Sequence, residues 1–193
     1  AHDLGYLRTA ELADRIEDTL TTIESLERHE GHLLNWYDTV NLAPLAPRYV
    51  STVDSGNLAG HLLTLRPGLI ALLDRPILEP RWLDGLGDTL AILEEAAGDP
   101  APATLTQFRK DLESACASRP ATLPTAQRVL DRLAQSAEAV AEDLEHEPES
   151  QVGRWWAGAL TRQCRASRDE LSLLAPWTGL PEAPDGLGDL PEI

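Results

Sequence analysis

Apolar residues recur along most of the chain at steps of three and four, the spacing that lines one face of an α-helix. The first stripe has steps of 4, 4, 3 and 3 and consists of Leu12, Ile16, Leu20, Ile23 and Leu26. Thr9 can cap the start of this segment, and Gly31 can end it. We therefore expect a helix over residues 9–30.

Further stripes, separated by Pro and Gly, predict five more helices. The second helix should begin near Ser51, because residues 51–54 fit a capping box with Asp in place of Glu. Pro67 and Gly68 should kink or split it. The other four helices are expected over residues 81–97, 104–118, 124–147 and 149–175. Since no alternating strand pattern is present, the sequence predicts an all-α protein of about six helices, arranged as helical hairpins or a bundle.

Composition narrows the classes of partner. The 32 acidic and 16 basic residues give a net charge of -16. A surface this acidic repels phosphate backbones, so we expect no nucleic-acid partner. No apolar run approaches the length of a membrane span, so we expect no membrane insertion by this segment. Two cysteines and five scattered histidines form no disulfide framework and indicate no metal site.

The chain contains no methionine, not even at residue 1. Because an independent reading frame begins with methionine, we expect an excised or processed piece of a longer protein. A free-standing protein whose first residue was removed stays open as an alternative.

The segment Gly31–Gly60 is the candidate for chemistry, because the sequence has no nucleotide-binding loop, metalloprotease motif or serine elbow. Trp36 and Tyr37 offer flat apolar faces with polar edges, which suit sugar rings. Carboxylates are the groups that glycoside chemistry uses, and Asp38 and Asp54 could converge if the loop folds back over the second helix.

Simpler structural roles are open for the same residues. The rings of Trp36 and Tyr37 could close the end of a helical bundle. Arg48 and Asp38 could form a surface ion pair worth ~0–1 kcal/mol. A role limited to capping the second helix is open for Ser51, Thr52 and Asp54.

A long run of this segment resembles a known family. Residues 34–63, LNWYDTVNLAPLAPRYVSTVDSGNLAGHLL, resemble the central region of bacterial cyclic β-1,2-glucan synthases. Two further runs are similar to the same family: LGYLRTAELADRIEDTLTTIESLERHEGH at residues 4–32, and WWAGALTRQCRASRDELSLLAPW at residues 155–177. The resemblance is weaker between about residues 97 and 148.

The resemblance implies a large inner-membrane protein with several modules. One module is a glycosyltransferase that uses UDP-glucose. A central glucoamylase-like module, an (α/α) toroid of six helical hairpins, closes the glucan ring by transglycosylation, and a phosphorylase-like module trims the chains. This segment would belong to the central module, need no cofactor, contact β-1,2-glucan and the remaining modules, and lie on the cytoplasmic side of the bacterial inner membrane.

Residues that match the family's glucan cleft follow from the resemblance. Trp36 and Tyr37 would stack on sugar rings, while Asp38, Asp54 and Asn57 would bind glucose hydroxyls. The full set of expected substrate-binding residues is Asn35, Trp36, Tyr37, Asp38, Ser51, Thr52, Asp54 and Asn57. The catalytic acid and base would belong to later helices, so this chain alone should be inactive.

Six helices cannot close a toroid of six hairpins, so we expect an incomplete part of one with an inserted helical bundle. The expected division is an N-terminal part with the cleft loop (1–96), an inserted helical pair (97–148), a long returning helix (149–177) and a flexible tail (178–193). The alternative is a non-catalytic structural module that joins the glycosyltransferase to the downstream modules.

Overall fold

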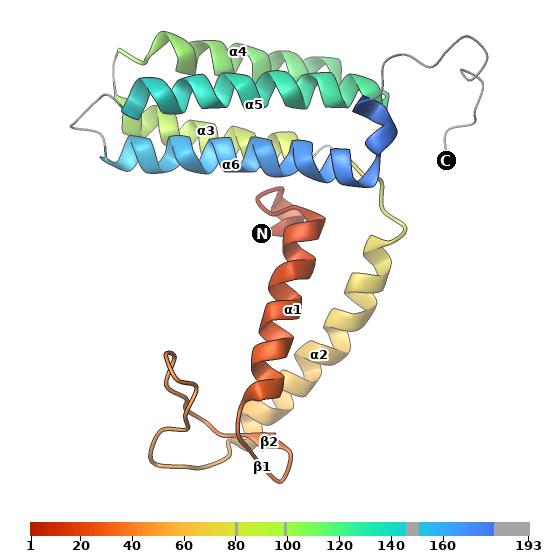
Figure 1. Ribbon diagram of the computed structural model, residues 1–193, viewed down its shortest axis with the longest axis vertical. Coiled ribbons are helices and arrows are strands. Elements are labelled where there is room, and N and C mark those ends of the chain that lie inside the picture. The colour runs from red at the N-terminus through yellow and green to blue at the C-terminus, as the bar shows by residue number, and fades with distance from the viewer. Residues whose placement is uncertain (80, 99, 146–150, 180–193) are drawn as a thin grey trace. The chain divides into compact units, whose positions relative to one another are not determined.

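The computed structural model describes residues 1–79, 81–98, 100–145 and 151–179 (Figure 1). The described residues contain six α-helices: α1 (Thr9–Ser25), α2 (Thr52–Leu72), α3 (Arg81–Ala97), α4 (Ala103–Ser118), α5 (Leu123–Glu145) and α6 (Gln151–Leu174). They also contain the 3-10 helices η1 (His2–Leu4) and η2 (Pro176–Gly179), and the two-residue strands β1 (Arg28–His29) and β2 (His32–Leu33). The predicted all-α class is confirmed.

The chain divides into two compact units. Unit 1 contains residues 1–9 and the described residues from 77 onward, and unit 2 contains residues 10–76. The expected boundary at residue 96 falls near the end of α3, inside unit 1. The expected division, which concerns modules of a longer protein, stays a prediction.

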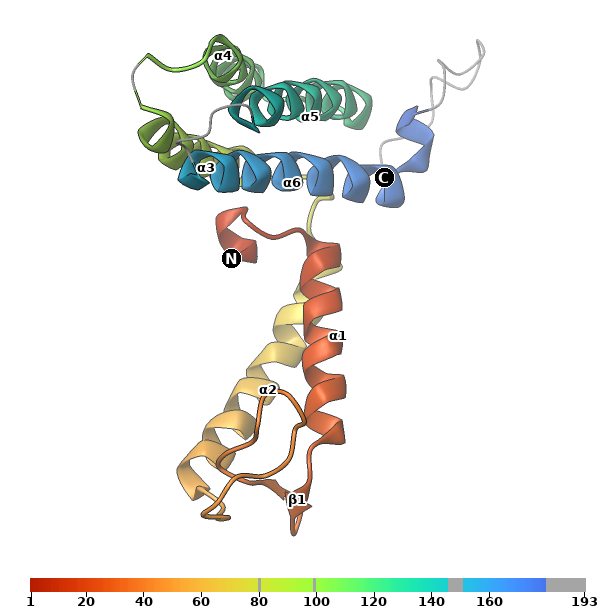
Figure 2. The same cartoon turned by 60° about the vertical axis from the view of Figure 1, so that its left-hand side comes forward.

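Unit 1 is a four-helix bundle (Figures 1 and 2). Each of α3, α4 and α5 packs against the next helix along the chain, and α6 also packs against α3, which closes the ring of four. Short connections between successive helices favour this antiparallel arrangement. The expected inserted pair, α4 and α5, therefore shares one core with α3 and α6.

The core of unit 1 draws apolar side chains from all four helices. Fully buried examples, one from each helix, are Leu93, Phe108, Leu133 and Leu160. A buried hydroxyl is satisfied inside this core: Thr161 Oγ1 donates to the carbonyls of Ala157 and Ala137 at 3.0 and 3.1 Å. The helical stripes seen in the sequence thus meet along one continuous apolar interior.

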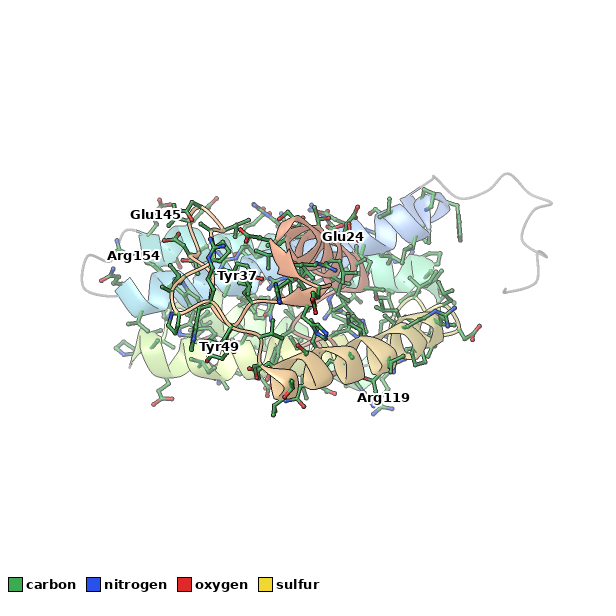
Figure 3. All side chains as sticks on the ribbon, turned by 90° about the horizontal axis from the view of Figure 1, so that it is seen from below. Glu24, Tyr37, Tyr49, Arg119, Glu145 and Arg154 are labelled. Carbon is green, nitrogen blue, oxygen red and sulfur yellow. The ribbon has the colours of Figure 1, made fainter. Side chains whose placement is uncertain are left out.

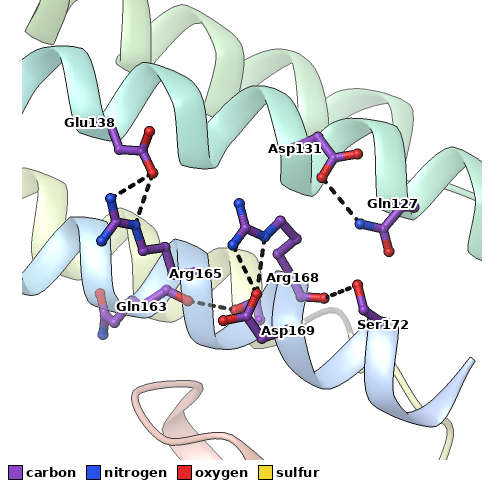
Figure 4. Close-up of polar contacts among 9 residues, drawn as sticks. Gln127, Asp131, Glu138, Gln163, Arg165, Arg168, Asp169 and Ser172 are labelled. Carbon is purple, nitrogen blue, oxygen red and sulfur yellow. Dashed lines mark hydrogen bonds and ion pairs between the residues drawn. The ribbon is translucent and has the colours of Figure 1, made fainter. Parts of the chain in front are cut away.

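Ion pairs lie at the surface of the bundle, where α5 faces α6 (Figure 4). Arg165 donates to Glu138 Oε1 at 2.8 Å across the two helices. Arg168 donates to the neighbouring Asp169 at 2.9 Å. These groups are partly exposed, so each pair contributes at most about 1 kcal/mol to stability.

The N-terminal residues of unit 1 are held against α3 by two glycines. Gly5 adopts a left-handed conformation with φ 76° and packs on the first turn of α3, where a Cβ would collide with the carbonyl oxygen of Arg81. A Cβ on Gly85 would lie 2.5 Å from the carbonyl oxygen of Gly5. Tyr6 reinforces the contact, because its hydroxyl donates to Asp88 Oδ2 at 2.5 Å. This close approach requires glycine at both positions.

Unit 2 consists of α1, a small hairpin, a long loop and α2. The predicted helix over residues 9–30 is wrong at its C-terminal end, because α1 stops at Ser25 and β1 pairs with β2. Glu30 and Gly31 form the turn with φ values of 49° and 85°. Positive φ at both turn residues is the geometry of a two-residue type I′ hairpin, so Gly31 serves a strand turn rather than a helix end.

The second predicted helix is found, but Pro67 does not split it. α2 runs without interruption from Thr52 to Leu72. Pro67 removes the N–H that would bond the carbonyl of Leu63, which lies on an exposed part of the helix, since Leu63 is 77% exposed.

Other helix limits agree closely with expectation. α3 spans residues 81–97 as predicted, and α4 begins one residue earlier than predicted. The expected end of the fifth helix at 147 and start of the sixth at 149 lie outside the described residues, as does the tail beyond 179. Residues 176–179 form η2, which packs on α5 and α6 rather than beginning an unstructured tail.

Candidate functional site

The loop between β2 and α2 has an ordered backbone of its own. Asn35 N donates to the carbonyl of Tyr49 at 2.9 Å, which closes the base of the loop. Further in, Leu45 N donates to the carbonyl of Trp36 at 3.0 Å and Asp38 N donates to the carbonyl of Ala43 at 2.9 Å. The loop therefore folds back on itself as an irregular hairpin before it enters α2.

Asn35 is the centre of the polar contacts at the base of this loop. The orientation of its amide that satisfies every neighbour has Oδ1 accepting from Trp36 Nε1 and from the Tyr49 hydroxyl, both at 2.7 Å. In that orientation Nδ2 donates to Asp54 Oδ2 at 3.1 Å. One half-buried side chain thus joins two aromatic residues of the loop to a carboxylate in the first turn of α2.

The two aromatic residues that Asn35 holds remain open to solvent. The side chain of Trp36 is 58% exposed and that of Tyr49 is 46% exposed. Their polar atoms are fixed by Asn35, whereas much of each ring stays uncovered. An oriented, uncovered ring beside a carboxylate is the combination that suits a sugar, because sugars have apolar faces and hydroxyl rims.

Tyr37, which Figure 3 labels together with Tyr49, belongs to the same loop before α2. Its hydroxyl donates to the carbonyl of Glu27 and accepts from the amide of Leu34, both at 2.7 Å. Tyr37 is only partly exposed. These contacts tie the loop to the hairpin, so the hydroxyl of Tyr37 is already engaged in holding the local backbone.

Asp38 binds the amides of its own turn. Its Oδ1 accepts from Val40 N at 2.7 Å and from Asn41 N at 3.0 Å. The hydrogen bond from Asn41, followed by that from Val40, lowers the pKa of Asp38 below its ordinary value. These two hydrogen bonds to Asp38 come from its own turn, whereas Asn35 donates to Asp54.

The expected residues of α2 lie in its first two turns. Ser51 is the N-cap, and its Oγ accepts from Asp54 N at 3.2 Å. Thr52, Asp54 and Asn57 are exposed. Ser51 therefore fulfils the capping role considered from the sequence, and Asp54 contributes both a capped amide and a carboxylate that meets Asn35.

Arg48 does not pair with Asp38, the ion pair considered from the sequence. It donates to Glu27 Oε1 at 2.9 Å, which links the end of the loop to the segment after α1. The charge of Asp38 is instead stabilised by two amide hydrogens of its own turn.

Tyr49 belongs with the candidate site but was not in the set expected from the sequence. Tyr49 lies 14 residues after Asn35, so no local spacing shows that their side chains meet. The available signal was compositional, namely a third aromatic residue in the same loop. For Thr52 and Asn57, membership of the expected set rests only on their place in the matched sequence.

The described residues hold no group of three or more His, Cys, Asp or Glu side chains that could bind a metal ion. None of the described helices combines the length and the apolar character that crossing a bilayer requires. What the site offers is an aromatic surface with polar groups at its edge, suited to binding a neutral polar ligand.

Comparison with known proteins gives a relative for most of the chain. A scan against protein-family models finds no match. The chain is 35% identical over 182 residues to the cyclic β-(1,2)-glucan synthase NdvB of Rhizobium meliloti (strain 1021). The match covers 86% of this chain but 6% of the synthase. The chain is therefore related to this cyclic β-(1,2)-glucan synthase and corresponds to a small part of its length.

Proposed function

We propose that this chain is a segment of a cyclic β-1,2-glucan synthase and supplies part of the glucan-binding surface of the module that cyclises linear β-1,2-glucan by transglycosylation. The relation to NdvB supports the type of protein. The exposed rings of Trp36 and Tyr49, held by Asn35 next to Asp54, support the glucan contact. This cluster is the observation that carries the proposal.

Each part of the cluster has a defined role in the proposal. Trp36 stacks on the apolar face of a glucose unit, with its ring orientation fixed by the hydrogen bond from Nε1 to Asn35. Asp54 accepts hydrogen bonds from glucose hydroxyls. Of the other expected residues, Asn57 lies three residues after Asp54 in α2, whereas Tyr37 and Asp38 support the loop that carries Trp36.

In this proposal the site binds glucan but does not contain the catalytic carboxylates of a glycosidase. The catalytic acid and base come from another part of the synthase, as does the transferase module that uses UDP-glucose. The chain by itself binds glucan without cyclising it, and in the cell it acts as part of a larger protein at the cytoplasmic side of the inner membrane.

Titration calorimetry with linear β-1,2-glucan tests the binding. We expect weak binding by the unmodified chain and about tenfold weaker binding by Trp36→Ala, which corresponds to about 1.4 kcal/mol. Trp155→Ala is the matched control, because Trp155 is 60% exposed but lies on α6 in unit 1. Equal affinities for Trp36→Ala and Trp155→Ala, or no heat with long glucan, would contradict the proposal.

The second candidate is a structural module without glucan contact. It is favoured by the backbone contacts of Tyr37, Asp38 and Ser51, which stabilise the loop and the start of α2. In this case Asp54→Asn in the full synthase leaves the yield of cyclic glucan unchanged. If Asp54 binds glucan, the same substitution lowers the yield while the amount of folded protein stays constant.

A further inference from the structure

Unit 2 has secondary structure but no buried core. None of residues 10–76, all of which the structure describes, is buried. Neither α1 nor α2 contains a buried residue, although the two helices contain 17 and 21 residues. Ordering each residue costs about 1–2 kcal/mol of conformational free energy, which burial of apolar surface normally offsets. The described residues of unit 2 provide little of that offset.

The apolar character of α2 is the second observation. A helix on the surface of a globular protein normally has one apolar stripe and one charged face. Within α2, Asp54 and Arg66 are the only residues that carry full charge at neutral pH. Apolar residues on more than one face of a helix indicate that more than one face is normally buried.

The apolar side chains of α2 point in more than one direction. One stripe, at steps of four and three, consists of Leu58, Leu62, Leu65 and Leu69. Val53, Leu63 and Ile70 are all exposed and lie away from that stripe, since each residue turns the helix by about 100°. Leu63 is 77% exposed. A single flat partner could cover only one of these two faces.

The second face can also accept a closely packed neighbour. Gly56 and Gly60 lie four residues apart on the same side as Val53 and Leu63. A Cβ built on either glycine meets no atom within 4 Å. The backbone of α2 is therefore bare along this face, and an adjoining helix could approach it without a collision.

We propose that α2 is an interior helix of a longer polypeptide, covered on both faces by uncharged, leucine-rich faces of further helices from the same polypeptide. The matched relative supports this source, because the aligned region makes up 6% of it and ample further chain is present there. The low charge of α2 fits an apolar partner, in contrast to the net charge of -16 carried by the whole chain. This proposal does not depend on glucan binding.

A second copy of this chain is a less suitable occupant. A twofold interface uses one patch on each copy, so it leaves the other apolar face of α2 uncovered. Two copies also bring together two molecules of the same net charge.

Thiol labelling of Leu63→Cys tests the proposal. The background is Cys116→Ser, because Cys116 is exposed whereas Cys164 is buried and has no exposed surface. The variant is labelled in this chain and in the full-length protein that carries the sequence, and each rate is divided by the rate in urea. Leu173→Cys in this chain, at a site 69% exposed on α6, gives the rate for an uncovered leucine position.

The expected result is a Leu63→Cys rate in this chain close to that of Leu173→Cys, and a rate about tenfold or more lower in the full-length protein. Equal normalised rates in the two proteins would overturn the proposal. Protection that rises with the concentration of this chain would also overturn it, in favour of a second copy. Circular dichroism of each variant confirms that the helices have formed before labelling.

Discussion

The two units of this chain are built from the same secondary structure but differ in what their helices cover. The four helices of unit 1 bury side chains such as Leu93, Phe108 and Leu160 in one core. The two helices of unit 2 bury none. Helical periodicity in a sequence therefore indicates where helices form, but it does not show whether the apolar face is covered within the same chain.

The stabilising core and the candidate site lie in different units of the chain. Unit 1 contains the apolar core that can stabilise a domain by itself. Unit 2 carries the candidate site, where Trp36 and Tyr49 are held by Asn35 on a loop with little apolar support. Residues exposed on a loop are free to contact a ligand. Under the proposal for α2, further helices supply the remaining support for unit 2.

The largest effect is expected from a cavity in unit 1. Phe108 is 0% exposed, so Phe108→Ala should lower the free energy of unfolding by ~3–5 kcal/mol through lost burial and an unfilled cavity. Leu63→Ala in unit 2 should change it by less than ~0.5 kcal/mol. Denaturant unfolding followed by circular dichroism measures both, and similar losses for the two variants would contradict the contrast between the units.

A smaller effect is expected where the N-terminal residues meet α3. Gly85→Ala places a Cβ against the carbonyl oxygen of Gly5 and should destabilise unit 1 by ~1–3 kcal/mol. Gly87→Ala is the matched control, because a Cβ on Gly87 meets no atom within 4 Å. This control should be stabilising by ~0.4–1 kcal/mol, since alanine reduces the freedom of the unfolded chain. Thermal unfolding of the pair isolates the steric contact from helix propensity.

In unit 2 the start of α2 should depend on its cap. Ser51→Ala removes the oxygen that accepts from Asp54 N, which should cost ~0.5–2 kcal/mol of local helix stability. Hydrogen exchange of the Asp54 amide measures the loss. Thr52→Ala, one residue later, keeps the cap and should leave that exchange rate almost unchanged.

The smallest effect concerns pH. Hydrogen bonds from Asn41 and Val40 lower the pKa of Asp38 in the folded loop. The stabilisation they give is therefore present above the unfolded pKa, about 3.9, and is lost as pH falls through the lower folded value. Carboxyl titration by NMR should give a lower midpoint for Asp38 in the folded chain than in urea. Equal midpoints would show that the turn does not hold the charged carboxylate.

Local sequence patterns predicted much of unit 1. Apolar steps and flanking prolines predicted both ends of α3 correctly, and they predicted the start of α4 to within one residue. The pattern failed between residues 26 and 33, because helical periodicity extended past Ser25 while the two-residue turn at Glu30 and Gly31 favoured a hairpin. Short-range turn geometry prevailed there over a weak continuation of the stripe.

The candidate site was only partly predictable for a similar reason. The sequence indicated the segment and the residue Trp36 because aromatic residues are unusually dense there, and it indicated Asp54 because residues 51–54 fit a capping pattern at a helix start. It did not indicate that Asn35 would connect them, or that Tyr49 would join the cluster. Those contacts depend on the loop folding back, which is set by backbone hydrogen bonds between residues distant in sequence.

The sequence by itself determined the all-α class, most helix limits and the acidic character of the chain, since each follows from local periodicity or composition. Only the tertiary structure decided which apolar stripes meet in a core, that Gly5 and Gly85 allow the N-terminal residues to approach α3, and that α2 is left uncovered. Packing is a property of surfaces brought together by the whole fold, and the same stripe of leucines looks alike in sequence whether or not a partner covers it.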